Sequence, residues 1–326
     1  MKNNSIAVVI CTYNGEKYIA EQLDSVLRQT HPADEIIIQD DNSTDSTFDI
    51  LTEYANKCDT IKLFRNKSSL GINKNFFSAM FRASSTFIAI CDQDDLWESD
   101  KLEIQLDNIG DSMLCAGRSK PFSDDGSFVY YDKRLPNITP LRMMYCAEIA
   151  GHTMMIRRDM LQSLPLECKI FSRNYYDIIF SVVAAINESV VYLDKILVRQ
   201  RRHADASTYS SNSSSLPSAS NGLRILFWCI CHYNYIKREG NYYYIDWLEL
   251  LLKLNVKTTV ANDSIKMMRL QTKSGLLNFI KFQMFCLKHR RDIFHTEGSA
   301  LFNFPRALLF PIMNCHYQRF LILSRK

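Results

Sequence analysis

The sequence predicts an α/β protein in which helices cover both faces of a mostly parallel sheet. Short, entirely apolar runs recur along the first hundred residues, and segments with apolar residues at helical spacing separate them. Strands that are buried on both faces are apolar throughout, so this alternation is typical of a parallel sheet. With 326 residues, 47% of them hydrophobic, the chain is long enough for one large or two medium domains.

The first repeating unit is a strand at residues 6–11, IAVVIC, followed by a helix. In that helix Ile19, Leu23 and Val26 recur at a spacing that places them on one face. The same unit then repeats, with strands expected at residues 35–39, 60–65 and 86–90 and helices within residues 40–58 and 71–83.

The alternation becomes less regular beyond residue 112, and we expect a first domain to end near residue 205. Residues 206–221 are rich in serine and are expected to be a linker or loop. Residues 222–326 follow as a helical region rich in aromatic and basic side chains. The remaining elements of the first domain, residues 1–205, are expected at residues 127–132 (a strand), 175–186 (a helix) and 189–203 (a hairpin).

Charge is divided unevenly along the chain. Residues 222–326 hold 16 Lys and Arg against 6 Asp and Glu, whereas residues 1–221 hold 23 against 29. A basic region rich in aromatics is typical of a surface that meets an anionic partner, so peripheral membrane association through residues 222–326 is one hypothesis. The alternative is that these helices pack on the first domain or form a homodimer. No nucleic-acid partner is expected.

Other features favour a cytoplasmic location, with the inner face of the plasma membrane as the membrane surface concerned. The ten cysteines are scattered through apolar segments without zinc-ligand spacing, as expected of reduced core residues. The N-terminal apolar run has only six residues, too few for a signal peptide. No apolar run reaches the roughly 18 to 20 residues that span a bilayer.

The stretch CDQDDLW, residues 91–97, places Asp92, Asp94 and Asp95 directly after the fourth expected strand. Carboxylates this close repel one another unless a cation, hydrogen-bond donors or water compensate them. The cluster is therefore either a cation site or a solvated turn, since Asp also favours turns and helix starts.

Polar residues also follow the first two expected strands. Thr12, Tyr13 and Asn14 follow the first strand, and Asp40 and Asp41 follow the second. Because ligands bind beyond the carboxyl ends of parallel strands, these residues and the acidic cluster are expected to converge on one crevice.

With these motifs the chain resembles the family 2 inverting glycosyltransferases of the GT-A fold, over about residues 5–205. The resemblance lies in the order and spacing of CTYNGEKYIAEQLDSVLRQT, DDNSTDST, NKSSLGINKNF, CDQDDLWESDKL, GHTMMIRRDML, and YYD followed by RQRRH. CDQDD followed by an aromatic residue is typical of the rhamnosyltransferase-like branch. The resemblance implies the GT-A nucleotide-diphospho-sugar transferase fold, with a C-terminal helical extension.

The resemblance also implies a divalent cation, Mn²⁺ or Mg²⁺, beside the diphosphate of a nucleotide-sugar donor. Its implied ligands are Asp94, with Asp92 and Asp95, and His203. One of the three carboxylates would turn to the ribose instead, and the sequence leaves open which. For His203 the alternative is an ordinary surface or hydrogen-bonded histidine.

The resemblance places further residues along the donor. Asp41 would accept from a pyrimidine N–H, and capping of the next helix is the alternative role for Asp40 and Asp41. Lys74 has an ordinary surface position as its alternative. The residues implied to bind the nucleotide-sugar are Thr12, Tyr13, Asn14, Asp40, Asp41, Asn73, Lys74, Asp92 and Gln93.

Inversion at the anomeric carbon needs a general base for the acceptor hydroxyl. The matching residue is Asp177 in RNYYDIIFSVV, with helix capping as its alternative role. Its neighbours Tyr176 and Ile178 depart from the family, in which an acidic residue or His often precedes the base and an aromatic follows it. The residues implied on the acceptor side are Gly151, His152 and Trp97.

The implied reaction moves a sugar to a hydroxyl of a glycan or lipid-linked acceptor, in the synthesis of a bacterial surface polysaccharide such as capsule or O-antigen. A sugar nucleotidyltransferase would carry a glycine-rich phosphate loop, whereas CTYNGEKY has one glycine. A processive synthase would need transmembrane helices and a Q-x-x-R-W element, which the sequence lacks. A non-catalytic partner of another transferase would have lost the metal carboxylates or the base, and all are present.

Overall fold

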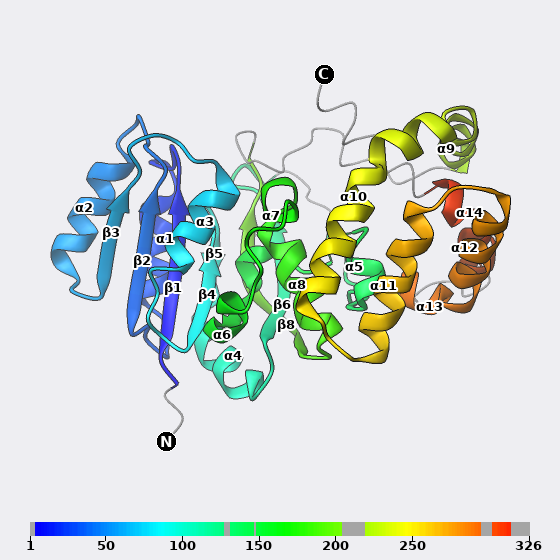
Figure 1. Cartoon of the computed structure of the whole chain (residues 1–326). Coiled ribbons are helices and arrows are strands. Elements are labelled where there is room, and N and C mark those ends of the chain that lie inside the picture. The colour runs from blue at the N-terminus through cyan, green and yellow to red at the C-terminus, as the bar shows by residue number, and fades with distance from the viewer. Residues whose placement is uncertain (1–3, 127–130, 147, 204–218, 295–301, 314–326) are drawn as a thin grey trace.

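The computed structural model describes residues 4–126, 131–146, 148–203, 219–294 and 302–313. Within these ranges the strands form one eight-stranded sheet, in the order β3-β2-β1-β4-β7-β6-β8-β5. The sheet is flanked by helices, and the helices after residue 218 form a further layer beside it (Figure 1).

The first half of the sheet is parallel, as predicted. β1 (Ile6–Thr12) lies between β2 (Glu35–Asp40) and β4 (Phe87–Cys91), and β3 (Ile61–Arg65) pairs with β2. Every residue of β1, β2 and β4 is buried, because both faces of the sheet are covered. The chain leaves β1 toward β2 and β3 and then returns to β4 on the other side. The carboxyl ends of β1 and β4 therefore flank a topological switch point, where such sheets bind ligands.

Alternate residues of β1 enter two separate cores, as the two-residue period of a strand requires. Ile6, Val8 and Ile10 pack in the core that includes α1 and α4. Ala7 and Val9 pack in the opposite core, with α3. The helices of this half are α1 (Ile19–Leu27), α2 (Thr47–Lys57), α3 (Ile72–Met80) and α4 (Lys101–Ile109).

The second half of the sheet is mixed. β7 (Met155–Arg157) runs antiparallel to β4 and to β6 (Leu114–Phe122). β8 (Val190–Arg201) runs parallel to β6 and antiparallel to the two-residue β5 (Leu96–Trp97). The helical segments that accompany these strands are α5 (Pro140–Met143), the 3₁₀ turn η1 (Gly151–Thr153), α6 (Arg158–Gln162), α7 (Ile170–Arg173) and α8 (Tyr176–Ile186).

The hairpin predicted at residues 189–203 is wrong, because the segment is one long strand. Asp194 and Lys195 are exposed in its middle, and in the sequence this polar pair resembles a turn. The strand instead absorbs an irregularity there, since its register against β6 shifts around Arg118. Most of the strand predicted at residues 127–132 lies outside the described residues.

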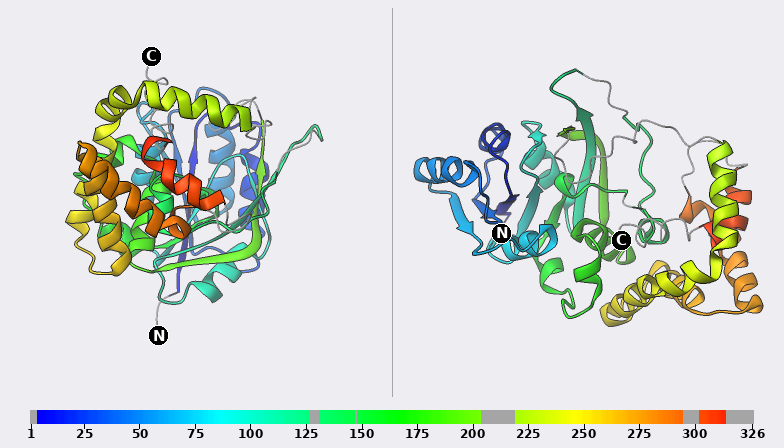
Figure 2. Two further views of the ribbon diagram at one scale, coloured as in Figure 1. Left: turned by 90° about the vertical axis from the view of Figure 1, so that its right-hand side faces the viewer. Right: turned by 90° about the horizontal axis from the view of Figure 1, so that it is seen from above.

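The C-terminal helices pack on the first domain through a shared core. Trp247 and Leu250 belong to the same buried cluster as Ile179 and Val183 of α8. Seen from the side of the C-terminal helices, this layer stands in front of the sheet (Figure 2). The predicted linker lies outside the described residues up to residue 218. The helices are α9 (Ala219–Cys231), α10 (Tyr233–Leu254), α11 (Thr259–Thr272), α12 (Leu276–Lys288), α13 (Arg290–Ile293) and α14 (Asn303–Met313).

Two properties of the described part of the chain bear on its environment. Its nine cysteines are all free thiols, and most of them are buried as predicted. None of its helices has both the length and the hydropathy needed to cross a membrane.

Candidate functional site

The acidic residues Asp92, Asp94 and Asp95 lie at the carboxyl end of β4, beside the switch point. Burial raises the pKa of Asp94, and the negative charge of Asp92 raises it further. Burial raises the pKa of Asp95 to about 7, although the charge of His152 opposes this. Carboxylates that share a partly buried site and have few donors are compensated best by a cation.

His152 lies against this cluster, because β7 runs antiparallel to β4 and so begins where β4 ends. His152 Nδ1 lies 3.3 Å from Asp92 Oδ2 and 3.5 Å from Asp95 Oδ2, and Nε2 lies 2.7 Å from Ser119 Oγ. Burial alone would lower the pKa of His152, but the neighbouring carboxylates raise it to about 9. The residue predicted on the acceptor side is thus a buried counter-charge to the acidic cluster.

Asp94 pairs with a second histidine. Its Oδ2 lies 2.8 Å from His203 Nε2, and the ring of His203 lies 4.6 Å from that of Tyr18. Nδ1 of His203 is buried and has no hydrogen-bond partner among the described residues. This pair brings together two residues that are 109 positions apart in the chain.

The donor set fits a divalent cation. One ligand atom from each of Asp92, Asp95 and His152 lies within 4.8 Å of the others. Asp95 Oδ2 is buried without a hydrogen-bond partner in the described structure, which leaves a lone pair for such an ion. Of the predicted ligands, Asp92 and Asp95 lie beside His152, which was predicted on the acceptor side and would bind an ion only after losing its proton, and Asp94 lies beside His203.

Arg201, at the end of β8, holds the main chain of the cluster. Its N–H donates to Asp95 Oδ1 at 3.0 Å, and its Nε donates to the Asp94 carbonyl at 3.0 Å. The rest of the guanidinium binds Glu21 and Asp124. Because protein groups occupy this guanidinium, Arg201 acts as a support for the site.

A single side chain ties the ends of β1 and β4 together. Gln93 Oε1 accepts from Tyr13 N at 2.9 Å, and Gln93 Nε2 donates to the Tyr13 carbonyl at 3.1 Å. A Cβ at position 15 would lie 2.4 Å from Gln93 Oε1, so Gly15 leaves the space that this amide occupies. The structure thus joins the first and fourth strand ends, as expected from sequence.

The end of β2 joins the same network from the other side. Asp40 is fully buried and accepts from Thr12 Oγ1 and from Ser43 N, both at 3.0 Å. Asn14, with a φ of 48°, donates its N–H to Ser43 Oγ at 3.0 Å and accepts from Thr44 N at 2.9 Å. The polar groups of Thr12, Asn14 and Asp40 therefore fix the loop after β2.

Asp41 is saturated with hydrogen bonds. It accepts from Asn66 Nδ2 at 2.6 Å, Ser69 Oγ at 2.7 Å, Leu70 N at 2.7 Å and Gly71 N at 2.9 Å. Burial alone would raise the pKa of Asp41, but these four donors lower it below its ordinary value. The side chain holds the loop before α3 at the edge of the crevice.

Asp177 lies in the first turn of α8, and Asn73 of α3 fixes the start of that helix. Asn73 Nδ2 donates to the Asn174 carbonyl at 2.5 Å, and Asn73 Oδ1 accepts from Tyr176 N at 3.2 Å. Burial raises the pKa of Asp177 to about 6, against the opposing hydrogen bond from Ile178 N at 2.8 Å. A carboxylate with this pKa is ionised at neutral pH and still basic enough to take a proton.

The acidic cluster is within electrostatic reach of Asp177. The negative charge of Asp92 raises the pKa of Asp177, and the charge of His152 lowers it. η1 meets the start of α8 closely, since a Cβ on Gly151 would lie 2.6 Å from the Tyr176 hydroxyl. Asp177, Gly151 and His152 are thus brought together, as their predicted roles require.

Two predicted residues stand apart from this arrangement. Trp97 is a core residue, packed near Leu102, with Lys101 Nζ 3.8 Å from its ring centroid. Its burial leaves no ring face for an acceptor, which corrects its predicted place in the acceptor wall. Lys74 is exposed on the first turn of α3.

Sequence reasoning missed the supports of the site, among them Ser119, Glu21 and Asp124. Ser119 and Asp124 lie outside the motifs quoted above, and Glu21 lies in the first of them without any sign there of its contact with Arg201. One signal was available for His152: the apolar residues 154–156 follow it, and a strand there beside β4 places His152 at the acidic cluster.

Comparison with known proteins identifies relatives of the first half of the chain. Residues 7–164 match the family described as glycosyl transferase family 2. The putative teichuronic acid biosynthesis glycosyltransferase TuaG of Bacillus subtilis is 39% identical over 102 residues, 31% of this chain and 40% of that protein. WfgD of Escherichia coli, a UDP-Glc:alpha-D-GlcNAc-diphosphoundecaprenol beta-1,3-glucosyltransferase, is 34% identical over 106 residues, 32% of this chain and 41% of that protein. The chain thus spans about two fifths of each relative.

Solved structures resemble nearly the whole chain. TarS 1–349 of S. aureus, in complex with UDP-GlcNAc, has a TM-score of 0.54 at 19% identity, with 98% of this chain and 92% of that chain covered. The mannosyltransferase PcManGT of Pyrobaculum calidifontis, in complex with GDP-Man and Mn²⁺, has a TM-score of 0.51 at 14% identity, with 98% and 88% covered. At these identities the likeness shows the fold, and it confirms the predicted fold class.

Proposed function

Since residues 7–164 are a domain of glycosyl transferase family 2, we propose that this chain moves a sugar from a nucleotide-diphosphate donor to a hydroxyl of a lipid-linked glycan, with inversion. One observation carries the proposal: the carboxylates at the end of β4 have few donors, the pKa values of Asp94 and Asp95 are raised, and Asp177 lies within electrostatic reach of the cluster. Such a pairing of a cation site with a base of raised pKa suits group transfer from a diphosphate.

The donor would lie across the ends of β1 and β4. Tyr13 is half exposed there and has a ring face free for a base or ribose. The polar atoms of Thr12, Asn14 and Asp40 form hydrogen bonds within the protein. We therefore propose that these residues shape the surface on which the donor lies. Asp41 would serve the donor through the loop at residues 66–71, which it holds in place.

Asp92, Asp94 and Asp95, with His203 and His152 beside them, would hold Mn²⁺ or Mg²⁺. Bound there, the ion would neutralise the charge that builds on the departing diphosphate. Arg201 Nε donates to the Asp94 carbonyl, and Gln93 ties the end of β4 to Tyr13. The Arg201 N–H uses Asp95 Oδ1, so Asp95 Oδ2 keeps its lone pairs for the ion.

Asp177 would take the proton of the acceptor hydroxyl. The acceptor oxygen then bonds to the anomeric carbon while the bond from that carbon to the diphosphate oxygen breaks, so that the configuration inverts. The proton ends on the Asp177 carboxylate and the electron pair on the nucleoside diphosphate. Asn73 contributes by fixing the turn that carries Asp177.

The acceptor class follows from the relatives. WfgD is named for a diphosphoundecaprenol-linked acceptor and TuaG for teichuronic acid biosynthesis, so we propose a lipid-linked glycan of a bacterial surface polysaccharide. Such an acceptor would place the enzyme at the cytoplasmic face of the plasma membrane, which is part of the proposal. The donor nucleotide and the rhamnosyltransferase-like specificity are part of the same proposal.

The test is calorimetric titration of UDP, GDP and dTDP into the protein, with Mn²⁺ and with EDTA. We expect one nucleotide to bind with Mn²⁺ and to lose at least about tenfold in affinity with EDTA or in Asp94→Asn, because a hard anionic ligand is removed. Asp107→Asn, which neutralises an exposed carboxylate on α4, is the matched control and should bind like wild type. Equal affinity in wild type, Asp94→Asn and chelated protein would exclude the metal role.

A further inference from the structure

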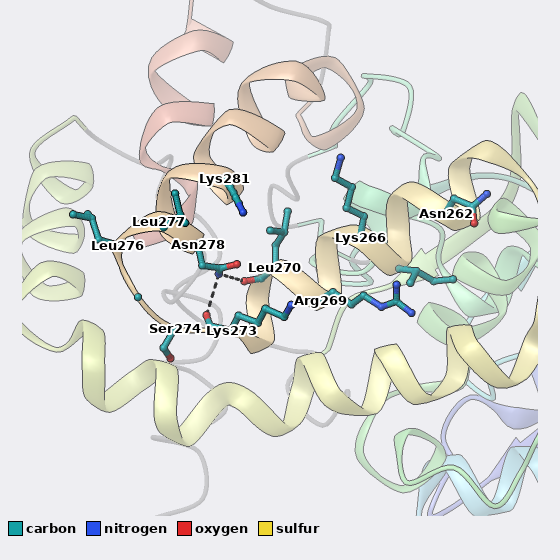
Figure 3. A pocket seen from close by; sticks show the side chains of 12 residues that line it. Asn262, Lys266, Arg269, Leu270, Lys273, Ser274, Leu276, Leu277, Asn278 and Lys281 are labelled. Atoms are coloured by element: carbon teal, nitrogen blue, oxygen red, sulfur yellow. Dashed lines mark hydrogen bonds between the residues drawn. The ribbon is translucent and has the colours of Figure 1, made fainter.

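A second cavity lies far from the acidic cluster in the chain, between α11 and α12. Its volume is about 710 Å³, and Figure 3 shows side chains of both helices around it. The Asn278 side chain holds the turn between the helices by donating to the carbonyls of Leu270 at 2.7 Å and Lys273 at 3.1 Å. The described residues that line the cavity are Asn262, Ile265, Lys266, Arg269, Leu270, Lys273, Ser274, Gly275, Leu276, Leu277, Asn278 and Lys281.

The charge of this cavity has one sign. Lys266, Arg269, Lys273 and Lys281 line it, and none of its described lining residues is acidic. Within the described part of the chain, none of these four cations forms an ion pair. The first turn of α12, a helix of 13 residues, also faces the cavity, and its leading N–H groups carry the partial positive charge of a helix start. The cavity is therefore suited to an anionic group.

The rim of the cavity is apolar. Leu276 and Leu277 are 76% and 68% exposed, and Met284 is 60% exposed further along α12. Leu276, Ile280 and Met284 are spaced by four residues, so they form one outward stripe of the helix. The opposite side of α12 is buried, so this helix is apolar on both sides, which is unusual for a helix that meets only water.

The neighbouring helices continue this apolar surface. α14 packs on α12 and on α9. Large apolar side chains are exposed on α9 and at the start of α14. On α9, Leu223 and Phe227 are exposed, and Phe302, just before α14, and Phe304, in its first turn, are exposed too. Cations beside aliphatic and aromatic side chains are typical of helices that lie in a membrane interface.

We propose that the cavity between α11 and α12 binds the phosphate headgroup of an anionic membrane lipid, with the outward stripe of α12 among the acyl chains. Charge complementarity argues for the phosphate, since no carboxylate is among the described residues that line the cavity with the four cations. The aliphatic rim argues for a lipid over a nucleic acid, which would find no stacking partners in Leu276, Leu277 and Met284. The site lies outside the catalytic crevice, so the proposal stands without the catalytic assignment.

Lipid binding at the cavity would also bear on the catalytic crevice, because α11 connects the cavity to α8. α11 forms one wall of the cavity, and Thr258 at its start donates from Oγ1 to the Ile186 carbonyl at the end of α8. α8 carries Asp177 at its other end. A lipid bound at the cavity would therefore fix the orientation of the proposed base relative to the membrane.

The experiment is co-sedimentation of the full chain with phosphatidylcholine vesicles, with and without phosphatidylglycerol, at low salt. We expect binding only with the anionic lipid. Lys273→Gln/Lys281→Gln should weaken it about 30-fold, because each basic residue near an anionic surface contributes about fivefold. The matched control, Lys57→Gln/Lys67→Gln, removes the same charge at exposed positions near β3 and should retain most of the binding. Thermal melting establishes that both variants are folded.

Several outcomes would overturn the proposal. Equal losses in the two double variants would mean that net charge alone drives binding. Stabilisation of wild type by inorganic phosphate, with no binding to anionic vesicles, would make the cavity a free-phosphate site. Binding to duplex DNA in place of vesicles would make it a nucleic-acid site. Nucleotide titration is unaffected by each of these, so this test and that of the catalytic proposal can fail separately.

Discussion

Two sets of carboxylates lie at the same edge of one sheet, and they have opposite properties. Asp40 and Asp41, after β2, are surrounded by donors, and four hydrogen bonds lower the pKa of Asp41 despite its burial. Asp92, Asp94 and Asp95, after β4, face one another and two histidines, and burial raises the pKa of Asp94 and Asp95. In the sequence, both sets are clusters of aspartates at the end of an apolar run.

The difference between the two sets is the number of protein donors that each carboxylate receives. A carboxylate offers about four lone-pair positions, and Asp41 has filled them with donors from the loop between β3 and α3. Asp95 keeps a buried oxygen, Oδ2, that accepts no hydrogen bond in the described structure and has only the His152 ring 3.5 Å away. Saturated carboxylates hold loops, and unsaturated ones remain available to an ion or a substrate.

The largest effect is expected at Asp177, which faces the unsaturated set. Asp177→Asn keeps the shape of the side chain but removes the proton acceptor, so kcat should fall by about 10² to 10⁴. Nucleotide affinity, measured by calorimetry, should stay near that of wild type. Steady-state kinetics with a donor and a confirmed acceptor measure the loss.

The control for this change is Asp159→Asn, an exposed acid near the start of α6. It should leave kcat unchanged. A fall of less than about tenfold in Asp177→Asn would assign Asp177 to the structure of the α8 N-terminus instead.

A direct test of the comparison replaces one carboxylate from each set. Asp41→Asn should lower the free energy of unfolding by about 2 kcal/mol, because an amide nitrogen cannot accept, so Leu70 N or Gly71 N loses its acceptor and the remaining hydrogen bonds lose their charge. Asp94→Asn should leave it unchanged or raise it. Urea unfolding at pH 8 with EDTA, followed by tryptophan fluorescence, measures both.

The signs follow from linkage. The pKa of Asp41 is lowered in the folded protein, so its ionised form adds stability above its unfolded pKa, and this is lost as the pH falls. The pKa of Asp94 is raised, so its ionised form costs stability at pH 8. Equal destabilisation by both replacements would contradict the division into two sets.

The smallest effect concerns pH. With the pKa of Asp177 raised to about 6, kcat/KM should be halved near pH 6 and should fall about tenfold for each further unit of acid. Burial and the charge of Asp92 raise this pKa, while the Ile178 N–H and the charge of His152 lower it. A pH–rate profile measured with saturating Mn²⁺ gives the pH at which kcat/KM is halved on the acidic side. A value near pH 4 would place the reacting carboxylate in a solvated environment.

The sequence predicted the part of the fold whose strands are buried on both faces. An apolar run such as residues 6–11 can hardly be anything but a covered strand, so β1 to β4 and their helices were found. β8 is half exposed, and its polar middle at Asp194 and Lys195 suggested a turn. Strands of the mixed half were harder to recognise because their polarity depends on neighbours that are distant in sequence.

Within the site, the sequence located the acids but not their donors. No local pattern says that the N–H groups of Leu70 and Gly71 reach Asp41, or that His152 lies beside Asp95. The capping role weighed for Asp40 and Asp41 is wrong, since α2 begins after Ser46 with no side-chain cap. These contacts arise only when the strands are placed side by side.

The core that the C-terminal helices share with α7 and α8 has a consequence for how such chains diversify. Trp247 and Leu250 belong to the same buried cluster as Ile179 and Val183, with α10 packed on α7 and α11 packed on α8, so the two regions cannot be exchanged independently. A chimera that takes its C-terminal helices from a relative must also inherit the residues of α8 that meet them, or it will leave a void or a clash. Changes in either region are thus expected to arise by co-ordinated substitution in both regions rather than by exchange of whole segments.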